Sequence, residues 1–358
     1  MNSVNIYGAE KLRKVSSMKC LTGRLKRNIC VVVVSMTLLV IVVTTFQTKT
    51  VDNFGRRMQV PLTGVTTWPT AVVVSNVTAA AFRGNLIKSS DQLADVDINS
   101  TRCLNRNVGN MTFPICTYET PIDKLVSGTF NKGFYWSRSI VDRFIRLLRR
   151  YADLEFVDLG ANIGAFTLPA ARVTHVVAVE PYSGSMARLF KSIQLGGVAK
   201  NVSLVYNAIS NIRSTYGLNV HHGNIGGTNL KRLQATVNTT ECRSGSCTRT
   251  ILLDDLLPLM CGRRAVMKVD IEGHQPQAFT NSTAAKFFDL IDVPLLVMEW
   301  GLLCGRQQNR VRPEVRNLIR FFTDRHYQVF SQSNRPLGTD CSRWGSDVIF
   351  TKLQTREF

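Results

Sequence analysis

The chain has 358 residues, of which 44% are hydrophobic, and its 44 Lys and Arg against 25 Asp and Glu give a formal net charge of +19. The hydrophobic fraction excludes a mainly disordered chain, and 24 Gly with 11 Pro exclude a collagen-like or low-complexity one. The charge is compatible with nucleic acid, a membrane surface or an acidic substrate, so its distribution along the chain has to decide among them.

Residues 1–28 form a basic tail, with seven Lys and Arg against the single Glu10, and an uncharged apolar run follows at 29–46. A run of this length just crosses a hydrocarbon core of about 30 Å. A cleaved signal peptide is the alternative, but its apolar core would be shorter, and Thr44–Gln47 is a poor cleavage site. We therefore predict a transmembrane signal anchor at 29–46 that contacts the lipid bilayer. The basic tail then faces the cytosol, and the rest of this single-pass type II protein faces the lumen of the Golgi or endoplasmic reticulum.

Sequons and cysteines are consistent with a lumenal chain. The sequons, which would make the protein a glycoprotein, all follow the apolar run, at Asn76, Asn99, Asn110, Asn201, Asn238 and Asn281. An oxidising lumen permits disulfides, and we predict the pairs Cys103–Cys116, Cys242–Cys247 and Cys304–Cys341. Cys261 is then the expected free thiol. The cysteines and histidines lack zinc-ligand spacing, so we predict no zinc finger.

Residues 47–102 are rich in Thr, Val, Ala and Ser and show no sustained period, which predicts a lumenal stem. The stem contains Asp95-Val96-Asp97, a D-x-D pattern such as Golgi glycosyltransferases use to hold a metal-bound nucleotide sugar. Because three-letter patterns recur by chance, a membrane-anchored glycosyltransferase is kept only as the alternative function.

From Cys103 to the C-terminus, short apolar runs alternate with amphipathic stretches. The expected strands are Glu155–Leu159, Val176–Glu180, Val202–Tyr206, Ala265–Asp270 and Pro294–Glu299, followed by a hairpin of Tyr327–Ser331 and Asp347–Thr351. The expected helices are 137–150, 163–172, 183–195, 274–288 and 312–325. This alternation predicts one α/β domain over 103–358, a Rossmann-like doubly wound fold with a mostly parallel sheet.

Ligands of such sheets bind at the carboxyl ends of the strands. The first strand runs into Asp158-Leu159-Gly160-Ala161-Asn162-Ile163-Gly164, where the glycines allow a tight turn and close approach of a ligand. Glu180 ends the second strand and is placed to accept hydrogen bonds from both hydroxyls of a ribose. Asn207 and Ala208 follow the third, where a polar side chain can meet an adenine edge. The order of these residues at the ends of successive strands predicts a nucleoside site. The absence of G-x-G-x-x-G argues against a nicotinamide cofactor.

These residues resemble a known family. D-L-G-A-N-I-G at 158–164 followed by V-A-V-E-P at 177–181 resembles the opening motifs of class I S-adenosylmethionine-dependent methyltransferases. The stretches Asn224–Thr228, Leu252–Leu257 and Lys268–His274 are similar to the FkbM-type members. The resemblance implies a seven-stranded sheet, an O-methyl transfer and cofactor contacts from Asp158, Gly160, Asn162, Gly164 and Glu180, with Asp270 beside the cofactor.

Catalytic candidates cluster after the fourth strand, where Asp270, Glu272 and His274 follow one another closely. Methyl transfer to an alcohol is an in-line displacement helped by a base, and histidine is the best single proton acceptor near neutral pH. His274 is also placed to cap a helix, and Glu272 to pair with an arginine. Asp270 and Glu299 end neighbouring strands and offer oxygen ligands for a divalent ion, but no metal site is predicted. His221-His222 either line the acceptor site or are simply exposed.

The sequence thus predicts a methyltransferase that uses S-adenosylmethionine and a glycan or other hydroxyl acceptor. Its basic residues lack the aromatic interleaving of a single-strand nucleic-acid binder, so no nucleic acid is expected. A non-catalytic nucleoside- or glycan-binding protein on the same fold is the second alternative.

Overall fold

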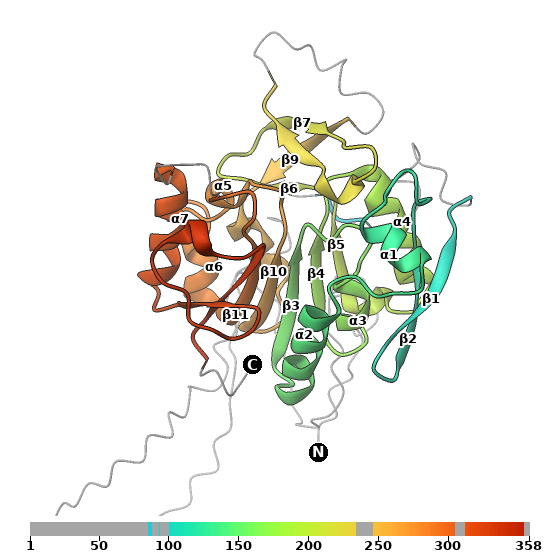
Figure 1. Ribbon diagram of the computed structural model, residues 1–358, viewed down its shortest axis with the longest axis horizontal. Coiled ribbons are helices and arrows are strands. Elements are labelled where there is room, and N and C mark those ends of the chain that lie inside the picture. The colour runs from blue at the N-terminus through green and yellow to red at the C-terminus, as the bar shows by residue number, and fades with distance from the viewer. Residues whose placement is uncertain (1–84, 88–92, 94–99, 234–245, 305–311, 354–358) are drawn as a thin grey trace, which may run out of the picture. The chain divides into compact units, whose positions relative to one another are not determined.

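The computed structural model describes residues 85–87, 93, 100–233, 246–304 and 312–353 (Figure 1). None of the helices formed by these residues is long and apolar enough to cross a bilayer. This finding corrects the prediction of a single-pass membrane protein. The predicted tail, the predicted span at 29–46 and the D-x-D pattern at 95–97 lie outside the described residues.

A seven-stranded sheet forms the centre of the molecule, which confirms the predicted α/β fold with a mostly parallel sheet (Figure 1). Its strands, in spatial order, are β12 (Gln328–Ser331), β13 (Asp347–Thr351), β11 (Asp292–Glu299), β10 (Arg264–Val269), β3 (Leu154–Leu159), β4 (Val176–Val179) and β5 (Val202–Val205). β13 runs antiparallel to both of its neighbours, β11 and β12, and the other neighbouring pairs of this sheet are parallel. The strand order turns between β3 and β10, so the carboxyl ends of β3, β4 and β10 meet at one edge.

Alternate residues of each central strand enter two separate hydrophobic cores, because successive side chains point to opposite faces of a sheet. Phe156 of β3 belongs to one core and Val157 to the other. The first core is covered by α2 (Arg138–Arg150), α3 (Thr167–Ala170) and α4 (Ser183–Leu195). The second is covered by α5 (Gln275–Ala278), α6 (Ala285–Leu290) and α7 (Pro313–Thr323). Burial of both faces explains why the strands read as continuous apolar runs.

The predicted helix over 274–288 is wrong as a single element. The chain forms α5, leaves helical geometry at Phe279 and begins α6 at Ala285. Between them, Thr280 hydrogen-bonds Thr283 through its side chain, and Thr283 N donates to the carbonyl of Thr280. A local turn thus separates the two short helices, and the apolar period alone does not predict it.

Two further β structures lie outside the main sheet, and the sequence did not indicate either. The first is a hairpin of β1 (Cys103–Val108) and β2 (Met111–Cys116), which is followed by the short helix α1 (Val126–Asn131). The second is a small sheet in the order β6 (Ala208–Ile209), β9 (Cys247–Ile251), β7 (Thr215–Asn219) and β8 (Asn229–Lys231). Figure 1 shows this small sheet above the carboxyl ends of β3, β4 and β5.

Residues 85–87 lie along the edge of β5, although the sequence assigns them to the stem. Ile87 N donates to the carbonyl of Leu204, and Tyr206 N donates to the carbonyl of Asn85. Ile87 is buried. The packed region therefore includes residues that precede Cys103.

Two predicted disulfides are confirmed, Cys103–Cys116 across the β1–β2 hairpin and Cys304–Cys341. Cys247 is also disulfide-bonded, while its predicted partner Cys242 lies outside the described residues. The prediction that Cys261 is a free thiol is wrong, because this residue is disulfide-bonded.

Candidate functional site

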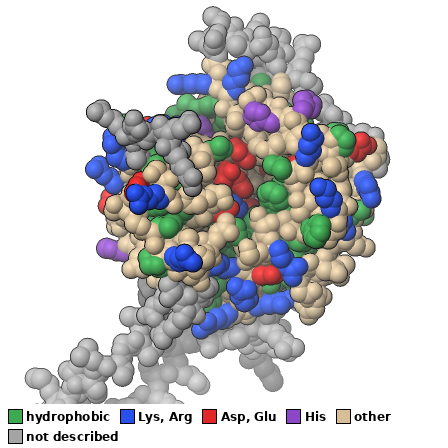
Figure 2. Space-filling view, viewed as in Figure 1, with side chains coloured by type: hydrophobic (Ala, Val, Ile, Leu, Met, Phe, Trp, Pro, Cys, Tyr) green, Lys and Arg blue, Asp and Glu red, His purple; other side chains and the backbone are tan. Residues whose placement is uncertain are grey.

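A cavity of about 360 Å³ lies at the carboxyl ends of β3, β4 and β10. Its lining comes from the loops after these strands, from the segment before β8 and from the region around α1. In Figure 2, acidic side chains gather in a hollow at the centre of the displayed face, with Lys and Arg distributed toward its margin. The fold thus places a predominantly acidic hollow where doubly wound sheets bind ligands.

The loop after β3 forms the floor of the cavity. Gly160 has φ +84°, and a Cβ there would lie 1.7 Å from the carbonyl oxygen of Asp270, so only glycine lets the β3 and β10 loops approach this closely. Asn162 also has a left-handed backbone, with φ +49°. Gly160, Ala161 and Asn162 all line the cavity, as the sequence predicts.

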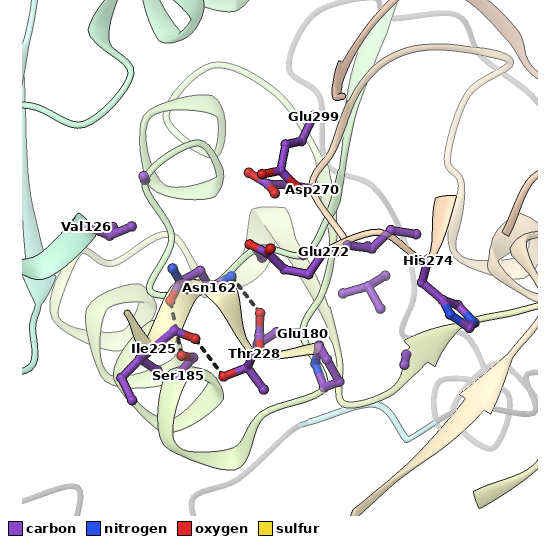
Figure 3. A pocket seen from close by; sticks show the side chains of 18 of the residues that line it. Val126, Asn162, Glu180, Ser185, Ile225, Thr228, Asp270, Glu272, His274 and Glu299 are labelled. Atoms are coloured by element: carbon purple, nitrogen blue, oxygen red, sulfur yellow. Dashed lines mark hydrogen bonds between the residues drawn. The ribbon is translucent and has the colours of Figure 1, made fainter. Parts of the chain in front are cut away.

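Glu180 follows β4 and faces the same cavity (Figure 3). Its carboxylate accepts hydrogen bonds from Asn162 N at 2.7 Å and from Tyr182 N at 2.8 Å. Burial raises the pKa of Glu180 to about 7; these two hydrogen bonds lower it and the nearby Asp158 and Asp270 raise it further. The backbone thus fixes a carboxylate that retains lone pairs for two ligand hydroxyls.

Asn207 and Ala208 line the cavity beyond Glu180, together with Ile209. The Asn207 amide is engaged elsewhere, because its oxygen accepts from Asn85 N at 2.7 Å and its nitrogen donates to the Arg249 carbonyl at 3.1 Å. Asn207 therefore forms part of the wall, with its amide held in place by these two hydrogen bonds.

Two residues that the family resemblance predicts as cofactor contacts do not line the cavity. Asp158 is fully buried, and its Oδ2 accepts from the Thr167 hydroxyl at 2.5 Å. Burial raises the pKa of Asp158 to about 6. Gly164 has φ +97° and packs under Leu189 and Leu168, so it supports the loop from below.

Three carboxyl groups form the opposite end of the cavity. Asp270, Glu272 and Glu299 each offer an oxygen atom, and these atoms lie within 4.8 Å of one another (Figure 3). Burial and the neighbouring carboxylates, Asp270 foremost, raise the pKa of Glu272 to about 8 and that of Glu299 to about 9. The Oε2 atom of Glu299 is buried and has no hydrogen-bond partner among the described residues. These carboxyls cannot all ionise at neutral pH, so the cluster holds protons that it can exchange.

A buried lysine lies beneath this cluster. Lys268 is only 2% exposed, and its Nζ contacts Asp270 at 3.1 Å and Asp347 of β13 at 3.2 Å. Burial lowers the pKa of Lys268, but the two carboxylates raise it by more, so the ammonium stays charged. Asp270 is therefore the member of the cluster with a fixed counter-ion.

His274 lines the cavity but lies apart from the three carboxyl groups in Figure 3. Its Nε2 is 2.9 Å from the Ser210 hydroxyl, and its ring packs edge-on against Tyr216. Burial lowers the pKa of His274 to about 4, which makes it a weak base. His221 and His222 are exposed and are not among the residues that line the cavity.

The structure adds wall residues that strand-end reasoning does not find. Asn224, Ile225, Gly226, Thr228 and Leu230 cover the cavity from the small-sheet side. From the N-terminal side it is bounded by Leu125, Val126 and Trp136, and near α4 by Ser185. Only the Asn224–Thr228 stretch carried a sequence signal, through the family resemblance; the others are brought in by tertiary packing.

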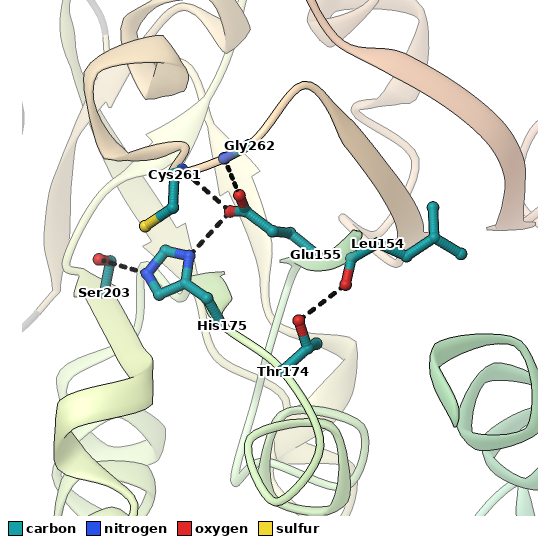
Figure 4. A network of polar contacts seen from close by, with 7 residues as sticks. All are labelled: Leu154, Glu155, Thr174, His175, Ser203, Cys261 and Gly262. Carbon is teal, nitrogen blue, oxygen red and sulfur yellow. Dashed lines mark hydrogen bonds and ion pairs between the residues drawn. The ribbon is translucent and has the colours of Figure 1, made fainter. Parts of the chain in front are cut away.

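Within the part of the chain that the structure describes, two clusters have a spacing suited to metal ligands. Asp270, Glu272 and Glu299 form one, and Glu155, His175 and Cys261 form the other. In the second cluster the Cys261 sulfur is already in a disulfide, and His175 and Glu155 hydrogen-bond each other (Figure 4). Of these two clusters, the first faces the cavity.

Comparison with known proteins identifies methyltransferases as structural neighbours. Neither a protein-family model nor a curated protein sequence matches the chain. An O-methyltransferase from Bacillus cereus in complex with SAH is 11% identical, with a TM-score of 0.35 over 66% of this chain and 92% of that one. A putative caffeoyl-CoA O-methyltransferase from Staphylococcus aureus is 10% identical, with a TM-score of 0.35 over 65% and 92%. A putative SAM-dependent methyltransferase from Streptococcus mutans is 9% identical, with a TM-score of 0.36 over 71% and 56%. Because these TM-scores are below 0.5, we infer function from the site and not from these neighbours.

Proposed function

We propose that the protein is an S-adenosylmethionine-dependent O-methyltransferase whose acceptor is a glycan hydroxyl. One observation carries this proposal: the same cavity contains a carboxylate placed to bind ribose hydroxyls and a cluster of carboxyl groups that can exchange protons. Glu180 stands at one end, and Asp270, Glu272 and Glu299 stand at the other.

The residues present fit the cofactor. Glu180 is held by two backbone amides in the position from which an acidic side chain accepts both ribose hydroxyls. Ala208 and Ile209 provide apolar wall next to it, suited to a flat base. Gly160 lets the loop after β10 pack closely against the loop after β3 beneath the site, because any Cβ there would collide with the Asp270 carbonyl. When bound, S-adenosylmethionine would supply an electrophilic methyl group.

The chain's own residues then orient the acceptor and take its proton. Aligning nucleophile and electrophile supplies about 7–11 kcal/mol of barrier reduction, and a placed base adds roughly 10²–10⁴ in rate. Among the predicted candidates, His274 is a weak base with its Nε2 at the Ser210 hydroxyl, and Asp270 is paired with Lys268. Glu272, with a pKa of about 8, is the base that matches a reaction near neutral pH. Glu299 lies beside it to share the proton.

The acceptor end suits a polyhydroxylated ring. Carboxyl groups hydrogen-bond hydroxyls, and Trp136 in the same cavity offers an aromatic face for the apolar side of a sugar. The acidic end of the cavity also disfavours a negatively charged group at the reacting position, since like charges repel. We therefore expect a neutral sugar hydroxyl at the reacting position.

Incubation of the full chain with S-adenosylmethionine labelled in its methyl group and a mixed glycan library tests the proposal. The expected result is label in an alkali-stable methyl ether on sugar, lost in the Glu272→Gln variant. Label found only in protein or lipid would exclude a glycan acceptor.

Calorimetry separates this function from the two alternatives. A methyltransferase binds S-adenosylhomocysteine, whereas a glycosyltransferase binds a nucleotide sugar through Asp95 and Asp97, which lie outside the described residues. A non-catalytic binding protein would bind S-adenosylhomocysteine weakly or not at all and transfer no label.

A further inference from the structure

A series of hydrogen bonds through three side chains leads from the N-terminal part of the domain to Glu180, the carboxylate proposed to bind the cofactor. The Tyr118 hydroxyl lies 3.2 Å from Ser185 Oγ, and Ser185 Oγ donates to Asn162 Oδ1 at 3.1 Å. Because the Ser185 proton is used toward Asn162, the Tyr118 hydroxyl is the donor in the first bond. Asn162 N in turn donates to Glu180 (Figure 3).

The side chains at both ends of this hydrogen-bond series, Tyr118 and Asn162, are tightly packed. A Cβ on Gly184 would lie 2.7 Å from the Tyr118 hydroxyl, so the glycine makes room for the tyrosine. A Cβ on Gly226 would lie 2.9 Å from Asn162 Nδ2, so the covering loop rests directly on the same amide. The Asn162 side chain is thus confined between Ser185 and the loop that covers the cavity.

Tyr118 is itself anchored to the segment that walls the cavity. It is 5% exposed, its backbone N donates to Ser127 Oγ at 3.1 Å, and its ring lies 3.5 Å from the Arg188 guanidinium. Ser127 follows Val126, which lines the cavity. Tyr118 therefore connects the α1 region to the floor of the site.

We propose that Tyr118, acting through Ser185, is a positioning residue for the cofactor loop. It holds Asn162 in the left-handed conformation that directs the Asn162 amide to Glu180. A non-glycine residue in this region is disfavoured, so the fold has to supply interactions that fix it. Tyr118 contacts neither the cavity nor the reacting groups, and the inference rests on the proposed cofactor site.

The test compares two buried tyrosines that each make one hydroxyl hydrogen bond. Tyr118→Phe removes the bond to Ser185. Tyr327→Phe removes the bond between the residue before β12 and the Val293 carbonyl of β11, away from the cavity. The tyrosines are 5% and 4% exposed, so their loss affects stability similarly. Calorimetry with S-adenosylhomocysteine should show affinity reduced about two- to tenfold for Tyr118→Phe and unchanged for Tyr327→Phe.

A second set of variants keeps the test independent of folding defects. Ser185→Ala should weaken binding by a similar factor, Ser185→Thr should restore it by returning the hydroxyl, and Tyr118→Phe should add little in the Ser185→Ala background. Wild-type affinity in Tyr118→Phe, or an equal loss in Tyr327→Phe, overturns the positioning role alone. Absence of S-adenosylhomocysteine binding by the wild-type chain overturns the proposed function, and this inference with it.

Discussion

Buried acidic side chains have opposite environments at the two ends of the strands of the main sheet, the amino edge and the carboxyl edge. At the amino edge, Glu155 accepts hydrogen bonds from the backbone amides of Cys261 and Gly262 and from His175, whose other nitrogen meets Ser203 (Figure 4). This network joins β3, β5, the residue before β4 and the loop before β10, and its side chains are all paired.

At the carboxyl edge, Asp270, Glu272 and Glu299 lie close together at one end of the cavity, and only Asp270 has an ion-pair partner among the described residues. The difference teaches that burial of a carboxylate does not by itself mark a functional site. An acid surrounded by donors stabilises the fold, whereas acids that face each other beside open space are available to a ligand or a proton.

The largest expected effect comes from closing the tight approach at the carboxyl edge. Gly160→Ala places a Cβ 1.7 Å from the Asp270 carbonyl oxygen and forces β3 and β10 loops apart, so we expect a loss of about 4 kcal/mol or more in the free energy of unfolding. Gly197→Ala is the control, because its φ is also left-handed, at +64°, with no atom within 4 Å. It should cost about 1–2 kcal/mol in urea unfolding. Equal losses would show that backbone strain, and not the close approach, explains both.

The next effect is on cofactor affinity. Glu180→Gln removes the charge that strengthens hydrogen bonds to both ribose hydroxyls, and we expect about 10²-fold weaker S-adenosylhomocysteine binding by calorimetry. Glu155→Gln, the same change at the amino edge, should leave this affinity within about twofold. A loss in both variants would contradict the functional distinction between the edges.

Stability should show the reverse pattern at the amino edge. In Glu155→Gln the new amide nitrogen faces backbone donors, so we expect a loss of about 1–3 kcal/mol in thermal or urea unfolding. Glu299→Gln should be neutral or stabilising at pH 8, because the carboxyl it replaces is already disfavoured as an anion. If Glu155→Gln and Glu299→Gln destabilised the protein to the same extent, the proposed difference between the two edges in stability would be wrong.

The last expected effect is a pH dependence of stability in the ligand-free protein. The folded-state pKa values of Glu272 and Glu299, about 8 and 9, lie above the ordinary value of 4.5. Between pH 4.5 and about 9 the folded protein therefore binds more protons than the unfolded chain, and the free energy of unfolding falls as pH rises. Urea unfolding from pH 6 to pH 9 should show this slope in wild type and a shallower one in Glu299→Gln. An unchanged slope would contradict the raised pKa.

Much of the fold followed from the sequence, because strands buried on both faces read as apolar runs and α4 follows its period over 183–195. The antiparallel pair of β12 and β13 was also predicted. The single helix predicted over 274–288 was wrong because a turn at Thr280–Thr283, which the apolar period does not reveal, separates α5 from α6. The small sheet went unrecognised because its strands are short and separated by loops.

The same limit applies to the site. Residues that end strands, such as Glu180 and Asp270, could be identified in the sequence because parallel topology brings strand ends to one edge. Whether each one faces the cavity depended on tertiary contacts: Asp158 is turned to Thr167, and the Asn207 amide is engaged by Asn85.

The sequence by itself determined the alternation of strands and helices and the order of polar residues at the strand ends, since both depend on local periodicity and spacing. Tertiary structure alone decided that His274 has its Nε2 at Ser210, and that Tyr118 reaches Asn162 through Ser185. These contacts join residues from different elements, and their burial sets the pKa values. No linear pattern encodes either the contacts or the dielectric environment that they create.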